Sequence, residues 1–244
     1  MFRLAQHKCF GRLNTSLPKN LLCLRNMRKG TGKQKYIIGI DEVGRGSLAG
    51  PVVVAAAAIP HNFKFSRFEI SVPLRDSKKL TKRAREAWVS CLSMQGDVHV
   101  AFGYVSPRVV DRINITRAAN RAATKAYMNL TAKRGWLIAK GARQTANRTQ
   151  IFLDGGLYLE KRAGAPHAKT VIRGDEKIKA VAVASIFAKV SRDNEMRRLA
   201  RKYPGYGFET HKGYGTEIHR RAVKKLGTSK AHRLSFLGNV LKKK

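Results

Sequence analysis

Short apolar runs, typical of buried β-strands, recur along the chain. The first covers residues 36–40 and the second covers 52–59, with a glycine-containing turn between them. Alternating apolar positions predict a third strand over 97–105. Two more short runs, at 150–153 and 168–173, complete a set of five predicted strands.

Helical patterns lie between and after these runs. Thr81 is placed to cap a helix that ends at Leu92. Ser106 is the expected cap of a helical region that reaches about residue 133 and breaks near 114–116. Later helices are predicted over 181–202 and 216–225, and a long loop over 134–149. This order predicts an α/β domain whose mixed sheet has helices on both faces.

The charge of the chain is strongly unbalanced. The 50 Lys and Arg residues face only 15 Asp and Glu residues, which gives a formal net charge of +35. We therefore expect a polyanionic partner, nucleic acid before membrane. No apolar run approaches the ~20 residues that cross a bilayer, so we expect a soluble protein with no membrane partner. The three cysteines have no close spacing and predict neither a zinc site nor disulfides.

Residues 1–34 contain eight Lys and Arg and no acid. This composition is typical of a mitochondrial transit peptide, so we expect a mitochondrial location, with nucleus or cytoplasm as the alternative. The alternative interpretation is a disordered basic arm that adds affinity for nucleic acid.

Carboxylates follow two of the predicted strands. Asp41 and Glu42 come directly after the first run, and Asp154 ends the run that begins at residue 150. If these strands are parallel, their acids meet at one edge of the sheet, where open α/β folds bind ligands. Such a cluster suits a divalent cation held by oxygen atoms. The alternative is that these acids are solvated turn residues.

Glycines and aromatics add candidate contacts to nucleic acid. Gly44 and Gly46 let backbone N–H groups approach a phosphate or sugar, and Arg45 between them adds a fixed charge. The stretch 203–216 alternates aromatics, glycines and cations, which suits stacking on bases while cations meet phosphates. Within it, we interpret Tyr203, Tyr206 and Phe208 as core residues.

The stretch IDEVGRGSLAGPVVVAA resembles the opening signature of the ribonuclease HII family. The resemblance recurs in order at DSKKL (76–80), FLDGG (152–156), RGDEKIKAVAVASIFAKVSRD (173–193), YPGYGFETHKGYGT (203–216) and HRLSF (232–236). It extends from about Tyr36 to Phe236. One departure is Ser47, where the family usually has proline; we expect it only to loosen a turn.

The resemblance implies the ribonuclease H fold with a small C-terminal helical part. It also implies a catalytic, metal-binding cluster of Asp41, Glu42, Asp154 and Asp175, with Glu176 as the alternative to Asp175. The expected ions are Mg²⁺ or Mn²⁺, because all these ligands are hard oxygen atoms. By the same resemblance, 35–202 form the catalytic domain and 203–244 a C-terminal segment that contacts substrate.

The activity implied is that of an endoribonuclease. It would cut the RNA strand of RNA–DNA hybrids, and would cut duplex DNA on the 5′ side of a single ribonucleotide, by a two-metal-ion mechanism that leaves 5′-phosphate and 3′-hydroxyl ends. Such cuts serve the removal of ribonucleotides and RNA primers in DNA replication and repair. We expect a monomer. The competing class is a nucleic-acid-binding protein without activity, which the charge alone would suit.

The resemblance also assigns the contacts to these two substrates. Gly44, Arg45 and Gly46 would read the ribose 2′-hydroxyl together with Tyr214. Lys78 and Lys212 are the expected phosphate contacts. For Lys78, a solvated lysine in a basic protein is the alternative.

Overall fold

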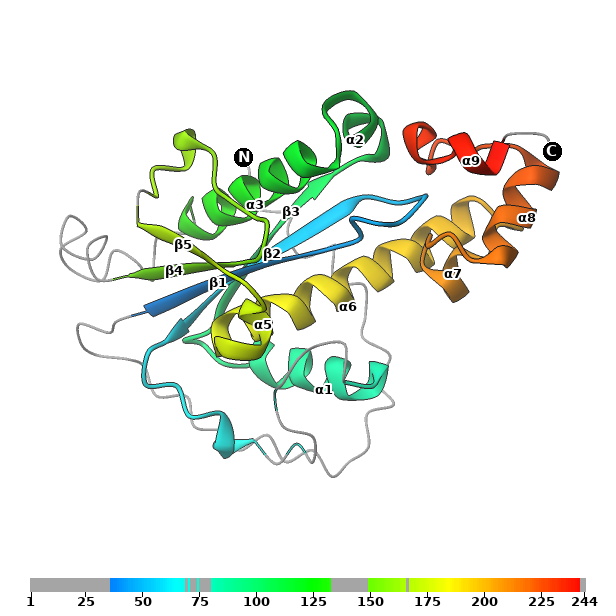
Figure 1. Ribbon diagram of the computed structural model, residues 1–244. Coiled ribbons are helices and arrows are strands. Elements are labelled where there is room, and N and C mark those ends of the chain that lie inside the picture. Colours follow the sequence, from blue (N-terminus) through cyan, green and yellow to red (C-terminus); the bar gives the residue numbers. More distant parts are fainter. Residues whose placement is uncertain are drawn as a thin grey trace, which may run out of the picture.

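The computed structural model describes residues 36–68, 70, 74, 80–132, 149–165 and 167–241. Within them one sheet has the strand order β3-β2-β1-β4-β5. β1 pairs antiparallel with β2 and parallel with β4. β2 pairs antiparallel with β3, and β4 parallel with β5. The predicted mixed sheet is confirmed (Figure 1). The strands are β1 (Tyr36–Val43), β2 (Val52–Pro60), β3 (His99–Val105), β4 (Gln150–Asp154) and β5 (Ala168–Val171).

Helices cover both faces of this sheet (Figure 1). One face packs against α3, and the other against α6 and α1. The helices are α1 (Lys82–Ser93), α2 (Pro107–Ile113), α3 (Ile115–Ala132), α5 (Gly174–Lys177), α6 (Lys179–Lys202), α7 (Phe208–His211), α8 (Glu217–Leu226) and α9 (Gly238–Leu241). No described helix is both long and apolar enough to cross a bilayer.

Local chemistry fixes the ends of several helices. The hydroxyl of Thr81 accepts from the N–H of Ala84 at 3.2 Å, so the predicted cap of α1 is confirmed. Ser106 stands at the N-cap of α2, but its side chain makes no capping hydrogen bond there. Asn114, with φ of 62°, separates α2 from α3 at the predicted break. Its side chain accepts from the N–H of Arg117, which starts the second helix.

The first strand is longer than its apolar run predicts. It continues past Ile40 to Val43, so Asp41 and Glu42 lie within β1 and not after it. Their backbones still pair with β2, and this pairing fixes the end of β1 that carries the two acids. Sequence patterns end a strand where hydrophobicity ends, whereas backbone pairing continues wherever the neighbouring strand offers partners.

Helix α6 lies unusually close to the sheet. A Cβ atom at Gly39 of β1 would lie 2.1 Å from the backbone carbon of Ala180, so only glycine fits there. The face of β2 toward this helix is made of small side chains such as Ala55 and Ala57, which are fully buried. Small residues on both strands therefore set the depth at which α6 packs.

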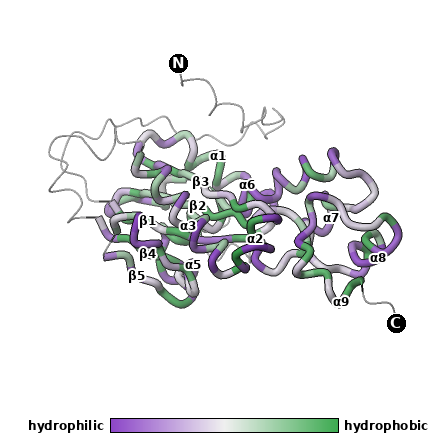
Figure 2. Tube along the Cα trace, turned by 90° about the horizontal axis from the view of Figure 1, so that it is seen from above, coloured by the Kyte–Doolittle hydropathy of each residue, from purple (hydrophilic) through white to green (hydrophobic). Residues whose placement is uncertain are grey.

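The second half of α6 extends beyond the sheet and carries the C-terminal helices (Figure 1). A separate core joins Met196 and Leu199 of α6 to Phe208 and Val223. Tyr206 and Phe208 are buried and Tyr203 packs against this core, as the sequence predicted. Hydrophilic residues are frequent along the tube around α7 and α8 (Figure 2).

Three sequence predictions fall on residues that the structure leaves undescribed. They are the extension 1–34, nearly all of the loop 134–149, and Lys78.

Replacing Gly39 with alanine should separate α6 from β1. We expect Gly39→Ala to lower the free energy of unfolding by about 1–3 kcal/mol, because the added methyl group meets backbone that cannot move aside. Urea denaturation measures the change. Gly96→Ala is the control, since no atom lies within 4 Å of a Cβ there. Equal stability of the two variants would contradict the close packing.

Candidate metal centre and nucleic-acid interface

The parallel pairing of β1 and β4 brings acids from both strands together. Ile40 pairs with Leu153, so the next residues, Asp41 and Asp154, stand side by side at one edge of the sheet. One carboxylate oxygen from each of Asp41, Glu42 and Asp154 lies within 4.8 Å of the other two. Three negative groups at this spacing repel one another unless a cation compensates them.

Burial makes this repulsion stronger at Asp41, which is only 5% exposed. Burial, and then the negative charges of Glu42 and Asp154, raise the pKa of Asp41 well above its ordinary value. Hydrogen bonds from the hydroxyl of Ser185 and the N–H of Glu42 oppose that rise. Ser185 lies on α6, so the close approach of this helix supplies a direct partner for the carboxylate.

The pKa of Glu42 depends on a similar balance between burial and nearby charges. Burial raises its pKa, and the nearby charge of Arg45 opposes the rise. Arg45 Nη1 lies 3.3 Å from one carboxylate oxygen of Glu42. The other, Oε2, is buried and has no hydrogen-bond partner within the described residues. An orphaned carboxylate oxygen beside two further carboxylates fits a hard divalent cation such as Mg²⁺ or Mn²⁺.

Asp175, the expected fourth ligand, is not part of that three-residue group. It is 6% exposed on α5, next to Gly174, whose N–H donates to Asp154 Oδ1 at 2.7 Å. Its neighbour Glu176 is exposed, which favours Asp175 as the inward carboxylate. The role of Asp175 as a ligand stays a prediction.

The turn after β1 is built around a glycine with φ of +89°, at Gly44. Gly46 is exposed, and no atom lies within 4 Å of a Cβ there, so its backbone is open to a ligand. Arg45 contacts Glu42, so the turn and the carboxylate cluster form one continuous surface.

Ser47 has a larger part in this turn than its sequence context indicates. It is fully buried, and its hydroxyl donates to the carbonyl of Gly44 at 2.8 Å. The same oxygen accepts from Arg192 Nη2 at 2.7 Å. The expectation that Ser47 only loosens the turn is wrong, because its hydroxyl bonds both to the carbonyl of Gly44 within the turn and to Arg192 on α6.

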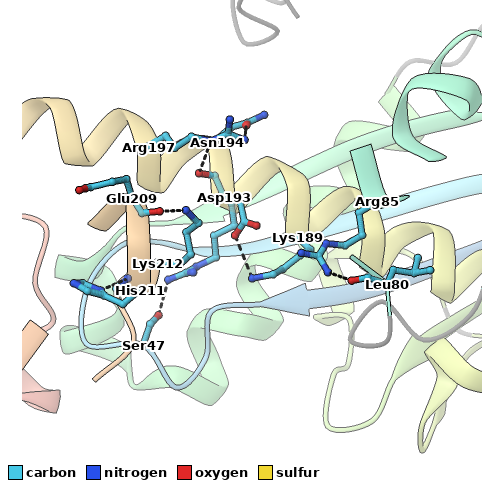
Figure 3. A network of polar contacts seen from close by, with 12 residues as sticks. Ser47, Leu80, Arg85, Lys189, Asp193, Asn194, Arg197, Glu209, His211 and Lys212 are labelled. Atoms are coloured by element: carbon cyan, nitrogen blue, oxygen red, sulfur yellow. Dashed lines mark hydrogen bonds and ion pairs between the residues drawn. The ribbon is translucent and has the colours of Figure 1, made fainter. Parts of the chain in front are cut away.

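Lys212 and Tyr214 come from the C-terminal segment, directly after α7. Tyr214 is 38% exposed, and its N–H donates to the carbonyl of His211. Lys212 Nζ donates to the carbonyl of Glu209 (Figure 3). Desolvation lowers the pKa of Lys212 and the charge of Asp193 opposes the change. Lys212 is therefore a partly buried cation that already has a protein partner.

Two buried histidines, His219 and His232, are linked to each other and to the backbone of Tyr214 by hydrogen bonds. The sequence analysis did not single them out. The N–H of Ser229 donates to Nδ1 of His232, which leaves the proton of His232 on Nε2. That proton points to Nε2 of His219, 3.2 Å away. His219 then donates from Nδ1 to the carbonyl of Tyr214 at 2.9 Å. The pattern is complete only when both rings are neutral.

Comparison with known proteins shows the family to which the chain is similar in sequence. A family model described as Ribonuclease HII matches residues 38–238. Proteins described as Ribonuclease HII from Bacillus cereus (strain Q1) and Bacillus anthracis (strain CDC 684 / NRRL 3495) are 39% identical over 201 residues. The match covers 82% of this chain and 68% of each relative.

Solved structures share the architecture. Ribonuclease H2 from Pyrococcus horikoshii OT3 superposes with a TM-score of 0.61 at 24% identity, over 84% of this chain and 96% of that one. A PCNA:RNase HII complex from Archaeoglobus fulgidus gives 0.60 at 24% identity, over 85% and 98%. Bst-RNase HIII in complex with Mn²⁺ gives 0.57 at 20% identity, over 85% and 68%. The ribonuclease H-like fold is thereby confirmed.

These relatives correct the predicted location. The mitochondrial expectation drawn from residues 1–34 is wrong, because the relatives at 39% identity come from Bacillus species, and bacteria have no mitochondria. A basic, acid-free composition is shared by transit peptides and by other cationic segments, so it could not distinguish them.

The pair of buried histidines predicts a loss of stability in acid. Burial lowers the pKa of His219 to about 4, and also lowers that of His232. At these two histidines the unfolded chain therefore binds more protons than the folded one between pH 6.5 and 4, so their contribution to the free energy of unfolding should fall as pH falls. Urea denaturation at pH 7, 6 and 5 measures this slope.

Two variants isolate the contribution of the buried ring. His219→Gln should flatten the slope, whereas His167→Gln, at an exposed position, should leave it unchanged. Identical slopes for wild type and His219→Gln would contradict the assignment of neutral rings.

Proposed function

The chain belongs to the ribonuclease HII family and is therefore a ribonuclease H, and from that premise we propose which substrates and residues it uses. It cleaves the RNA strand of RNA–DNA hybrids and cuts on the 5′ side of a single ribonucleotide in duplex DNA. The products carry 5′-phosphate and 3′-hydroxyl ends, and the cuts serve ribonucleotide and primer removal in DNA replication and repair. The observation that carries the proposal is the oxygen cluster of Asp41, Glu42 and Asp154 beside the open turn at Gly46.

The four carboxylates Asp41, Glu42, Asp154 and Asp175 are the proposed ligands of two Mg²⁺ or Mn²⁺ ions. Bound ions of this kind lower the pKa of water and neutralise charge on the leaving 3′-oxygen. The protein supplies position: Ser185 orients Asp41, and the N–H of Gly174 orients Asp154. The close packing of β1 against α6 would help to hold these groups in place for in-line attack on the phosphodiester.

Substrate choice is proposed to rest on the turn and on Tyr214. The backbone of Gly44, Arg45 and Gly46 surrounds the ribose 2′-hydroxyl, which both donates and accepts hydrogen bonds. Tyr214 stacks on the deoxyribose that follows the ribonucleotide, and its exposed ring supports this contact. Lys212 and Lys78 are proposed to meet backbone phosphates.

One chain is enough for this proposal, because every proposed group comes from residues 41–214; we accordingly propose a monomer. Residues 35–202 form the proposed catalytic domain and 203–244 the proposed substrate-contacting segment. A protein that only binds nucleic acid, which the charge of +35 would suit, has no need for three carboxylates at one buried edge.

Removing one carboxylate tests the chemistry. We expect Asp154→Asn to reduce Mg²⁺-dependent cleavage of a duplex with one ribonucleotide by at least 10³-fold, because an amide is a poor ligand for the ion and adds no charge. The protein should stay folded, and its melting temperature should respond less to added Mg²⁺. Glu217→Gln, an exposed change on α8, is the control. Substantial cleavage by Asp154→Asn would contradict the ligand set.

Replacing the exposed tyrosine tests recognition. Tyr214→Ala should lower cleavage at an isolated ribonucleotide by roughly tenfold or more, because a lost stacking contact of ~1.4 kcal/mol is one decade in rate. Cleavage of continuous RNA–DNA hybrid should fall less. Tyr214→Phe keeps the ring and should keep the ratio of the two activities. An unmoved ratio in Tyr214→Ala would make Tyr214 a structural residue.

A further inference from the structure

Arg192 is a fully buried arginine in the second half of α6. Burying a guanidinium is costly unless its N–H groups are paired. Here Nη2 donates to the hydroxyl of Ser47 at 2.7 Å and to the carbonyl of Ala49 at 3.2 Å. Nε donates to the carbonyl of Pro51 at 3.3 Å, whereas Nη1 is buried without a hydrogen-bond partner among the described residues. All three acceptors lie in the loop between β1 and β2.

The same side chain also contacts both parts of the proposed ribonucleotide sensor. A Cβ at Gly44 would lie 2.2 Å from Arg192 Nε, so the turn rests directly on the guanidinium. The guanidinium carbon lies 5.4 Å from the ring centre of Tyr214. Ser47 completes the link, because its hydroxyl accepts from Arg192 and donates to the carbonyl of Gly44.

We propose that Arg192 and Ser47 are positioning residues that set the turn at Gly44–Gly46 and the ring of Tyr214 relative to each other before substrate binds. The inference rests on the proposed function. A planar guanidinium presents its donors in a fixed geometry, so one rigid group defines the separation of two distant segments. A preset sensor avoids the cost of ordering both segments when a single 2′-hydroxyl must be recognised.

A direct contact between Arg192 and substrate does not account for this arrangement. The residue is 0% exposed, so a phosphate cannot reach it. A second buried arginine acts from the other side of the loop: Arg233 donates to the carbonyl of Arg45 at 2.8 Å and twice to that of Gly50. The turn is therefore fixed by donors from α6 and from the C-terminal segment.

The test compares two substrates in three variants. Ser47→Ala removes one oxygen from the link, and Arg192→Lys keeps the charge but cannot reach all three acceptors. Thr124→Val is the matched control, since it removes a buried hydroxyl that accepts from the N–H of Glu160, outside the sensor. We would measure kcat/KM with Mg²⁺ on duplex DNA carrying one ribonucleotide and on continuous RNA–DNA hybrid, together with melting temperatures.

We expect Ser47→Ala and Arg192→Lys to lower the ratio of single-ribonucleotide to hybrid cleavage by about three- to tenfold. Thr124→Val should leave this ratio at its wild-type value, even if it lowers the melting temperature as much as the other two variants do. Hydrogen exchange of the backbone N–H groups at 44–49 should quicken in Ser47→Ala, independently of activity.

An active wild type with an unchanged ratio and unchanged exchange in Ser47→Ala would overturn the inference and leave the proposed function standing. If Arg192→Lys does not fold, the result for Ser47→Ala alone tests the inference, because alanine fits in place of serine. A wild type that cleaves neither substrate would instead overturn the proposed function, and the inference with it.

Discussion

The close packing of α6 on β1 is the contact on which the rest of the site depends. Gly39 allows the backbone of Ala180 to approach where any side chain would collide. From that depth Ser185 reaches Asp41, and Arg192, further along the same helix, reaches the loop after the strand. A helix held farther away would lose both contacts together. The position of α6 therefore affects both the carboxylate cluster and the turn after β1.

The cluster of carboxylates is a local concentration of negative charge in a strongly basic protein. The chain carries a net charge of +35, yet three acids share one buried edge and Arg45 offsets only part of their repulsion. The pKa of Asp41 rises because burial and its neighbours disfavour the ionised form. A divalent cation would relieve both effects, and the net positive charge of the chain favours association with a polyanion.

Sequence patterns predicted much of the fold because local rules applied without conflict. Each of the five predicted strands is present, and Thr81 caps α1 as expected. Asp41 and Asp154 could be placed at one edge from parallel pairing alone. The end of β1 was misjudged, because ladder pairing with β2 overrides the loss of hydrophobicity at the two acids.

The groups that position the site could not be predicted from sequence patterns, because they are charged or polar residues that are buried, whereas such residues are usually exposed. Arg192 is one of 50 basic residues, and nothing in its local sequence separates it from a solvated cation. Its partners are a hydroxyl and two carbonyls in the loop between β1 and β2, and such contacts leave no periodic signal. The same holds for His219 and Arg233, which become recognisable only when distant segments meet.

Those distant contacts also decide how the C-terminal segment relates to the sheet. The N–H of Leu48 donates to the carbonyl of Gly213, and that of Arg233 to the carbonyl of Leu48. Asp111 on α2 accepts from the backbone of Leu234 and Ser235. Backbone pairing at the turn itself means that the segment cannot swing away without disturbing residues 44–50. The proposed recognition turn and the C-terminal segment are thus joined by backbone hydrogen bonds, although they are far apart in the sequence.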